Sequence, residues 1–195
     1  GLVFKEYEEN YDISIKSLEK LVKEYFDDDG FPISRNPSEL IVFSKYLTLC
    51  KECIINAQKY VPDFLLTIID KNLECIKLIL SPDNQIPLFN GGTESNLQDY
   101  SKYLSKFEAK IKQKKKYLGG LFFFIIRKNA IYFDAGEPPK KSFSRNYQSG
   151  PLSFEYYLDG KKIITNCGFG SKISQRFELL SRLTSAQSTL TLNDT

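Results

Sequence analysis

Hydrophobic residues at steps of three and four along the first half of the chain predict a series of helices. The first covers residues 15–25, and the Asp-Asp-Asp-Gly segment at 27–30 ends it. Another carries its hydrophobic positions over residues 65–79, between Pro62-Asp63 and Ser81-Pro82. Long helices that are joined by short turns are expected to pack antiparallel.

The helix between these two has the strongest start signal in the sequence. Asn36 suits the N-cap, Pro37 suits the first helical position, and Glu39 lies three residues after the cap, as in a capping box. One narrow hydrophobic stripe of about five turns then follows. It consists of Leu40, Phe43, Leu47, Cys50, Ile54 and Ala57.

A loop and a fourth helix separate these helices from the rest of the chain. The loop covers residues 83–92 and ends in Gly91-Gly92, where the backbone is expected to take angles that other residues avoid. The fourth helix is predicted over residues 99–112, with Tyr103, Leu104, Phe107 and Ile111 on one face.

The second half of the sequence predicts two β-hairpins. Residues 121–126 and 130–133 flank a three-residue turn at 127–129, and the favoured pair Asp159-Gly160 joins the next two strands. A short helix is expected near residues 174–180. Helices followed by antiparallel hairpins predict an α+β fold with the two kinds of element in separate layers.

The ends of the sequence suggest a piece of a longer protein. The chain starts with Gly1 rather than Met, and a strand predicted near Ser188 has only just begun when the sequence stops. About five strands without a partner sheet would also leave a hydrophobic face uncovered. We therefore expect an internal fragment.

Composition narrows the chemistry that the chain can perform. There is no histidine, the usual side chain for proton transfer near neutral pH and the commonest metal ligand, so Tyr, Arg, Lys, Asn or carboxylates must do any chemistry. The net charge of +3 gives no general attraction to nucleic acid or membranes. A basic run at 110–116 is interpreted as a helix end or as an electropositive rim for an anionic polymer.

Four cysteines make no disulfide framework in a chain of this length. Cys50 and Cys53 fit the hydrophobic side of a helix and are expected to be buried thiols rather than zinc ligands. The hydrophobic run at 121–126 has six residues, far fewer than the roughly 20 that a membrane-spanning helix needs. No integral membrane segment is expected.

Several segments, in the same order along the chain, resemble the heparinase II/III-like family. In the helical half they are Asp29-Gly-Phe-Pro-Ile-Ser-Arg-Asn-Pro37 and Leu88-Phe-Asn-Gly-Gly92. In the β half they are Ile131-Tyr-Phe-Asp-Ala-Gly136, the segment from Phe143 to Glu155, Ile164-Thr-Asn-Cys-Gly168 and Ala186-Gln-Ser-Thr-Leu-Thr-Leu192. Together they cover about residues 25–195.

The resemblance implies both an architecture and a reaction. Residues 1–116 would be the C-terminal part of an incomplete α/α toroid, and residues 117–195 the start of an antiparallel β-sandwich, with the site in the groove between them. Characterised members cleave acidic polysaccharides by β-elimination. A base, usually Tyr or His, takes the C5 proton of a uronate sugar, a polar group offsets the carboxylate charge, and the C4–O4 bond breaks.

The same resemblance nominates site residues. Tyr147 is the candidate for proton transfer and Asn36 for charge offset, while Arg35 and Arg145 are candidates to bind the substrate carboxylate. Glu39, at a position where lyases often have Tyr, and Asn90 complete the candidate substrate-binding set. These residues also have structural interpretations. Asn36 suits a helix cap, Arg35 an ion pair with the acidic segment at 27–29, Tyr147 packing, and Asn90 a turn.

Three positions of the family's metal site carry neutral amides in this chain. Gln148, Asn166 and Gln187 stand where relatives have His, Asp and His. Amides lack both the imidazole nitrogen and the carboxylate charge, so we expect no bound metal and no cofactor. The amides are instead expected to form a polar network that holds the same strands together.

Two functions stay open at this point. The first is a polysaccharide lyase that acts on uronate-containing glycans, and the second is a non-catalytic carbohydrate-binding or structural relative, or a fragment that is inactive because it is truncated. The expected partner is an acidic polysaccharide or oligosaccharide, not nucleic acid. The resemblance implies the cell envelope or periplasm of a Gram-negative bacterium, with the cytoplasm as the alternative. The sequence sets no oligomeric state.

Overall fold

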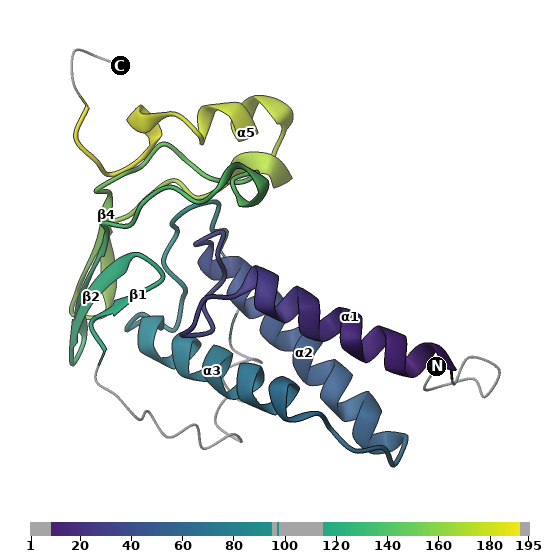
Figure 1. Ribbon diagram of the computed structural model, residues 1–195. Helices are drawn as coiled ribbons and strands as arrows, with labels where there is room; N and C mark the ends of the chain where they lie inside the picture. The colour runs from purple at the N-terminus through teal and green to yellow at the C-terminus, as the bar shows by residue number, and fades with distance from the viewer. Residues whose placement is uncertain (1–8, 95–96, 98–114, 192–195) are drawn as a thin grey trace.

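Helices occupy the first part of the chain and a small antiparallel sheet the second (Figure 1). This computed structural model describes residues 9–94, 97 and 115–191. The long helices are α1 Glu9–Tyr25, α2 Pro37–Asn56 and α3 Asp63–Ile79, and the short helix α5 is Gln175–Leu180. The fourth predicted helix and most of the basic run lie outside the described residues. The predicted α+β class is confirmed.

All the strands belong to one antiparallel sheet with the order β1-β2-β3-β4-β5. They are β1 Tyr117–Leu118, β2 Leu121–Ile126, β3 Asn129–Asp134, β4 Phe154–Leu158 and β5 Lys161–Ile164. Short 3-10 turns at Lys141–Phe143, Gly170–Lys172 and Thr184–Ala186 interrupt the loops of this half. A second sheet of the kind that would complete a sandwich stays a prediction.

The start of α2 follows the local sequence signal. Asn36 is the N-cap, and its side-chain Oδ1 accepts a hydrogen bond from the Ser38 backbone N–H at 2.9 Å. Glu39 reaches back across the cap as a capping box requires, but it accepts its hydrogen bond from the Ser34 hydroxyl. The cap is therefore confirmed, while the direct bond from Glu39 to the cap backbone is replaced by a contact with Ser34.

One hydrophobic core joins the helices to the sheet. Leu40, Leu65 and Ile76 contribute from the helices, while Leu121 and Tyr157 contribute from the inner face of the sheet, and all five are fully buried. Figure 1 shows the sheet standing at one end of the helices, beside the end of α3. The shared core fixes the two halves against each other, whereas a domain boundary between residues 116 and 117 stays a prediction.

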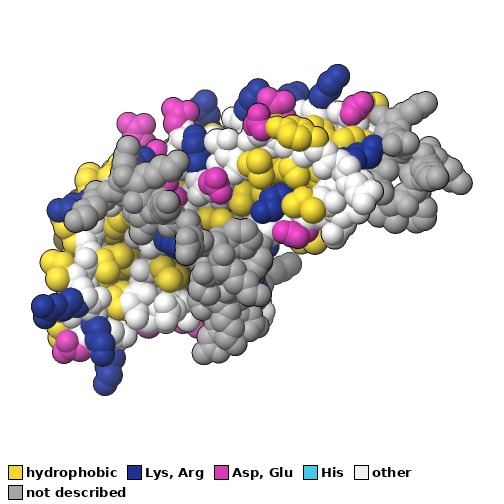
Figure 2. All heavy atoms as spheres, turned by 90° about the horizontal axis from the view of Figure 1, so that it is seen from below, with side chains coloured by type: hydrophobic (Ala, Val, Ile, Leu, Met, Phe, Trp, Pro, Cys, Tyr) yellow, Lys and Arg dark blue, Asp and Glu magenta, His cyan; other side chains and the backbone are white. Residues whose placement is uncertain are grey.

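The outer face of the sheet is hydrophobic and exposed. Phe124 on β2 pairs with Ile131 on β3, and they are 48% and 38% exposed. Phe122 and Ile126 of β2 and Leu158 of β4 are also exposed large hydrophobic residues. Figure 2 shows hydrophobic side chains that reach the surface at this end of the molecule as well as over the helices. The expected uncovered face is present.

The hairpin turns were predicted with mixed success. Asp159 and Gly160 form the expected two-residue turn, with φ of 50° and 78°. The turn between β2 and β3 is also a two-residue turn, because Asn129 pairs with Ile126 inside the ladder. The prediction of three turn residues there was wrong.

Three further expectations need correction. The two-residue strand β1 was missed, since a strand of that length leaves no alternation to read. Ser188 does not begin a strand within the described residues, although its backbone oxygen and its side chain both form hydrogen bonds with Phe154 at the start of β4. Cys53 is exposed and Cys50 only half-buried, so the expected buried pair is wrong.

No helix in the described part of the chain is long and hydrophobic enough to cross a membrane.

Candidate functional site

The turn before α2 brings the helical half to the β half. Asn36 is 3% exposed, and because its Oδ1 caps the helix, its Nδ2 amide is the group left to donate a hydrogen bond. Asn90, on the loop that follows α3, donates from Nδ2 to the backbone oxygen of Arg35 at 3.3 Å. The candidate residues Asn36 and Asn90 therefore lie on neighbouring segments.

Gly91 lies where the two halves meet. Its φ is +92°, and a Cβ added to it would lie 2.6 Å from the backbone oxygen of Asn146 and 3.1 Å from Nδ2 of Asn36. Its N–H donates to Oε1 of Gln148 at 3.1 Å. The loop after β3, which carries Arg145 and Tyr147, is thus packed against the Asn36 cap with only a glycine between them.

Tyr147 lies half-buried at this junction. Its hydroxyl is shielded from solvent and makes no hydrogen bond of good geometry with the described residues, while Arg35 and Asp134 are the charged groups that act on it. Burial raises the pKa of the Tyr147 hydroxyl, the Asp134 charge adds to the rise, and Arg35 opposes it. The phenol therefore holds its proton at neutral pH.

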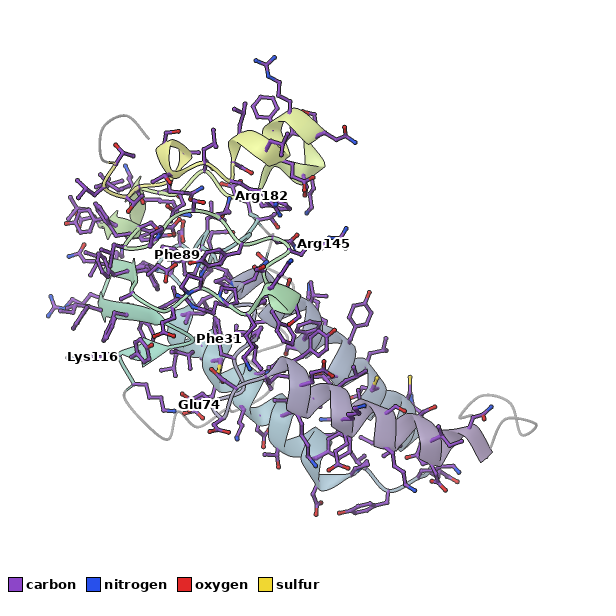
Figure 3. The ribbon with its side chains drawn as sticks, turned by 45° about the horizontal axis from the view of Figure 1, so that its top comes forward. Phe31, Glu74, Phe89, Lys116, Arg145 and Arg182 are labelled. Atoms are coloured by element: carbon purple, nitrogen blue, oxygen red, sulfur yellow. The ribbon has the colours of Figure 1, made fainter. Side chains whose placement is uncertain are left out.

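Arg145 and Arg35 differ sharply in their surroundings. Arg145 is exposed, and its side chain extends away from the body at the edge between the helices and the β half (Figure 3). Arg35 is 7% exposed and binds protein groups with its guanidinium, including an ion pair with Asp134. Of the two candidate carboxylate-binding arginines, only Arg145 offers its guanidinium to solvent.

Glu39 contacts the turn before α2. Its carboxylate accepts the hydroxyl hydrogen bond of Ser34 and belongs to the turn before α2. Its part in substrate binding stays a prediction.

Gln148, Asn166 and Gln187 form the expected polar network through hydrogen bonds with Ser181 and Ser188. The Nε2 amides of Gln148 and Gln187 both donate to the Ser181 backbone oxygen, at 2.8 and 2.7 Å. Oδ1 of Asn166 accepts from the backbone N–H and the hydroxyl of Ser188, at 3.1 and 3.0 Å. Among the described residues, no three His, Cys, Asp or Glu side chains gather as metal ligands would.

A pocket of about 420 Å³ opens beside Asn166. Leu88 and Phe169 supply hydrophobic walls, while Thr165, Asn166 and Lys172 supply polar groups. Pockets that combine hydrophobic walls with a few polar groups are typical of small-ligand sites.

Two buried carboxylates were missed in the sequence. Asp134 pairs with Arg35, and burial raises the pKa of its carboxyl while Arg35 lowers it in part. Glu155 is fully buried, and its Oε1 accepts hydrogen bonds from the backbone of Leu88 and Asn166 at 3.2 and 3.3 Å. Their strand positions carried a signal, because every second residue of a strand lies on the same face. Asp134 shares the inner face of β3 with Ala130 and Tyr132, and Glu155 shares that of β4 with Tyr157.

Comparison with known proteins agrees with this architecture. The profile described as "Heparinase II/III-like, C-terminal" matches residues 115–195. A search of the curated proteins finds no match. Solved structures do match: a crystal structure titled Heparinase III has a TM-score of 0.78 at 14% identity, with 98% of this chain and 36% of that chain covered.

Two other solved structures give the same result. The heparan sulfate lyase HepC from Pedobacter heparinus has a TM-score of 0.72 at 18% identity and is covered over 34% of its length by 98% of this chain. A heparinase III with methylated lysines has a TM-score of 0.77 at 20% identity, again with 98% and 34% covered. This chain therefore spans about a third of each of these proteins, and at such identities the likeness is one of fold.

The sequence profile over residues 115–195 and the shared architecture define an α+β class in which helices precede an antiparallel sheet. Residues 115–195 match the C-terminal domain of the heparinase II/III-like family, and the fold of the whole chain is similar to that of solved heparinase III structures.

Proposed function

We propose that this chain forms part of a polysaccharide lyase that cleaves uronate-containing glycans by β-elimination. On this proposal the helices belong to an α/α toroid and the five-stranded sheet to a β-sandwich. The observation that carries the proposal is the convergence of Asn36 from the helical half and the Arg145–Tyr147 segment from the β half at Gly91. A site of this kind needs groups from both halves within reach of one sugar.

Each group has a role that its surroundings support. On this proposal Nδ2 of Asn36, which the helix cap does not use, donates to the substrate carboxylate as negative charge develops on the enolate-like intermediate. Arg145, exposed at the edge of the junction, is suited to bind the same carboxylate through two N–H groups. On this proposal Tyr147 transfers the proton: its ionised oxygen takes the C5 proton, and the phenol so formed gives that proton to the leaving O4 oxygen. Because burial raises the pKa of Tyr147, the reaction is expected to speed up as the pH rises.

A second candidate function is carbohydrate binding without catalysis. The shielded hydroxyl of Tyr147 and the absence of histidine from the sequence favour it, because no other usual base stands ready at neutral pH. The pocket beside Asn166, with its Phe169 wall, offers the mixed surface that a sugar requires.

The test is an assay of the chain on uronate-containing glycans, followed by the ultraviolet absorbance of the conjugated double bond that elimination creates. The informative variant is Asn36→Ser, because serine is as good an N-cap as asparagine but lacks the amide donor. Asn56→Ser, at the exposed end of the same helix, is the matched control.

Three outcomes separate the candidates. Unsaturated product that Asn36→Ser lowers and Asn56→Ser leaves unchanged supports the lyase. Saturable glycan binding without product supports the binding protein. A chain that neither binds nor cleaves uronate glycans contradicts both functions for this chain.

A further inference from the structure

The guanidinium of Arg35 is held by five acceptors from the β half. Its Nε donates to the Gly119 backbone oxygen at 3.0 Å, and its Nη1 donates to the oxygens of Gly136 and Glu137 at 3.0 and 2.8 Å. Its Nη2 contacts the Gly120 oxygen at 3.4 Å and the carboxylate of Asp134. A guanidinium has five N–H donors, so these acceptors leave none for a substrate.

The backbone around Arg35 is shaped to admit the guanidinium. A Cβ at Gly120 would lie 2.4 Å from Nε of Arg35, and a Cβ at Gly136 would lie 2.5 Å from its Nη2. No residue larger than glycine fits at either position while Arg35 stays in place. The two glycines therefore belong to the binding pocket of this side chain.

Arg35 is also connected to the candidate site through its backbone and its charge. Arg35 directly precedes the cap residue Asn36, and its backbone takes a positive φ of 60°. Its backbone oxygen accepts the hydrogen bond from Asn90, and its guanidinium and Asp134 are the charges that act on Tyr147. A single residue, through its backbone and its side chain, thus acts on segments that carry three of the candidate residues.

We propose that Arg35 is a positioning residue, which locks the turn before α2 to the Gly119–Gly120 turn and the end of β3 so that Asn36 and Tyr147 face one site. It does not bind the substrate carboxylate, and that part falls to Arg145. The inference rests on the proposed function for what the site does, but the lock itself is a property of the fold.

Lysine cannot replace this lock, although it keeps the charge. An ammonium has three donors around one point, whereas the acceptors of Arg35 are spread around a planar fork. Arg35→Lys therefore keeps a cation at the junction and loses the geometry. Arg145→Lys is the matched control, because the same change at an exposed arginine leaves the junction intact.

The experiment compares both variants with the unaltered chain by three readouts. These are turnover of a uronate oligosaccharide, calorimetric affinity for it, and titration of the Tyr147 hydroxyl followed by NMR with ¹³Cζ-labelled tyrosine and assigned with Tyr147→Phe. Arg35→Lys is expected to lower kcat about 100-fold with little change in affinity, since a small misplacement of reacting groups has that effect. It is also expected to raise the pKa of Tyr147, because a lysine ammonium cannot take the position of the guanidinium, from which Arg35 opposes the rise that burial causes. Arg145→Lys weakens the affinity and leaves the Tyr147 titration unchanged.

The opposite pattern overturns the proposal. If Arg35→Lys weakens glycan affinity while kcat and the Tyr147 titration stay unchanged, Arg35 is a substrate ligand. If the unaltered chain neither binds nor cleaves glycans, the proposed function fails, and the Tyr147 titration alone decides whether the lock exists. If Arg35→Lys does not fold, Asp134→Asn replaces it. Loss of that negative charge is expected to lower the pKa of Tyr147, and an unchanged titration would refute the coupling.

Discussion

Replacing Gly91 with alanine is expected to destabilise the chain more than the same replacement at Gly160. Both glycines have a positive φ, +92° at Gly91 and +78° at Gly160. A Cβ at Gly91 meets the Asn146 backbone oxygen at 2.6 Å, whereas at Gly160 the nearest atom, Cδ of Lys128, is 4.0 Å away. The pair therefore separates the cost of the backbone angle from the cost of the crowded junction.

The magnitudes follow from these two terms. A non-glycine residue in the left-handed region costs about 1–2 kcal/mol, which both variants bear. Overpacking in a closely packed region adds about 1–3 kcal/mol, and only Gly91→Ala bears it. The Gly91 variant is therefore expected to lose about 1–3 kcal/mol more free energy of unfolding than the Gly160 variant.

Urea unfolding followed by circular dichroism measures this difference. The midpoint of each variant, analysed with a common slope if the slopes agree, gives the change in free energy of unfolding. Equal losses in the two variants would refute the reasoning, because they would show that Asn146 and Asn36 move aside freely. The candidate site would then lack the close contact between its two halves.

Three further outcomes are expected. Leu65→Ala, at a fully buried position, should cost about 2–5 kcal/mol of unfolding free energy by urea titration, and Leu49→Ala, on the exposed side of α2, less than about 0.5 kcal/mol. Cys75 should resist alkylation in the native chain while the exposed Cys53 reacts, as mass spectrometry would show, because burial raises the pKa of the Cys75 thiol; equal labelling would contradict this. Burial also raises the pKa of the Glu155 carboxyl, so folding favours its protonated form. The free energy of unfolding of the unaltered chain, compared with that of Glu155→Gln, should therefore fall as the pH rises from the ordinary glutamate pKa to the raised one. An advantage of the unaltered chain that grows with pH would refute this.

The elements that the sequence predicted well are those with local causes. The Asn36 cap needs only its own side chain and the next few residues, and the Asp159-Gly160 turn needs only two residues that accept positive φ. The prediction that Cys53 is buried failed because this residue lies next to Ile54 at the edge of a narrow hydrophobic stripe. A small rotation of the helix is enough to expose a side chain at that edge.

The details of the site had causes that are distant in the sequence. Glu155 looks like any strand glutamate until the Leu88 backbone, 67 residues earlier, supplies a donor for its carboxylate. Arg35 has the right chemistry for a substrate carboxylate, but the acceptors that occupy it come from the other half of the chain. Residue type gave the chemistry of both side chains, and only the fold determined their partners.

The span of the Arg35 contacts also bears on the order in which the chain folds. They join residues that are 84 to 102 positions apart, whereas α2 and α3 are neighbours along the chain. Closing a long loop costs entropy before any contact compensates for it, so local helix pairs form faster than distant junctions. We expect α2 and α3 to gain protection against amide hydrogen exchange before the turn at Gly119 does. The junction with the candidate site would then be completed last.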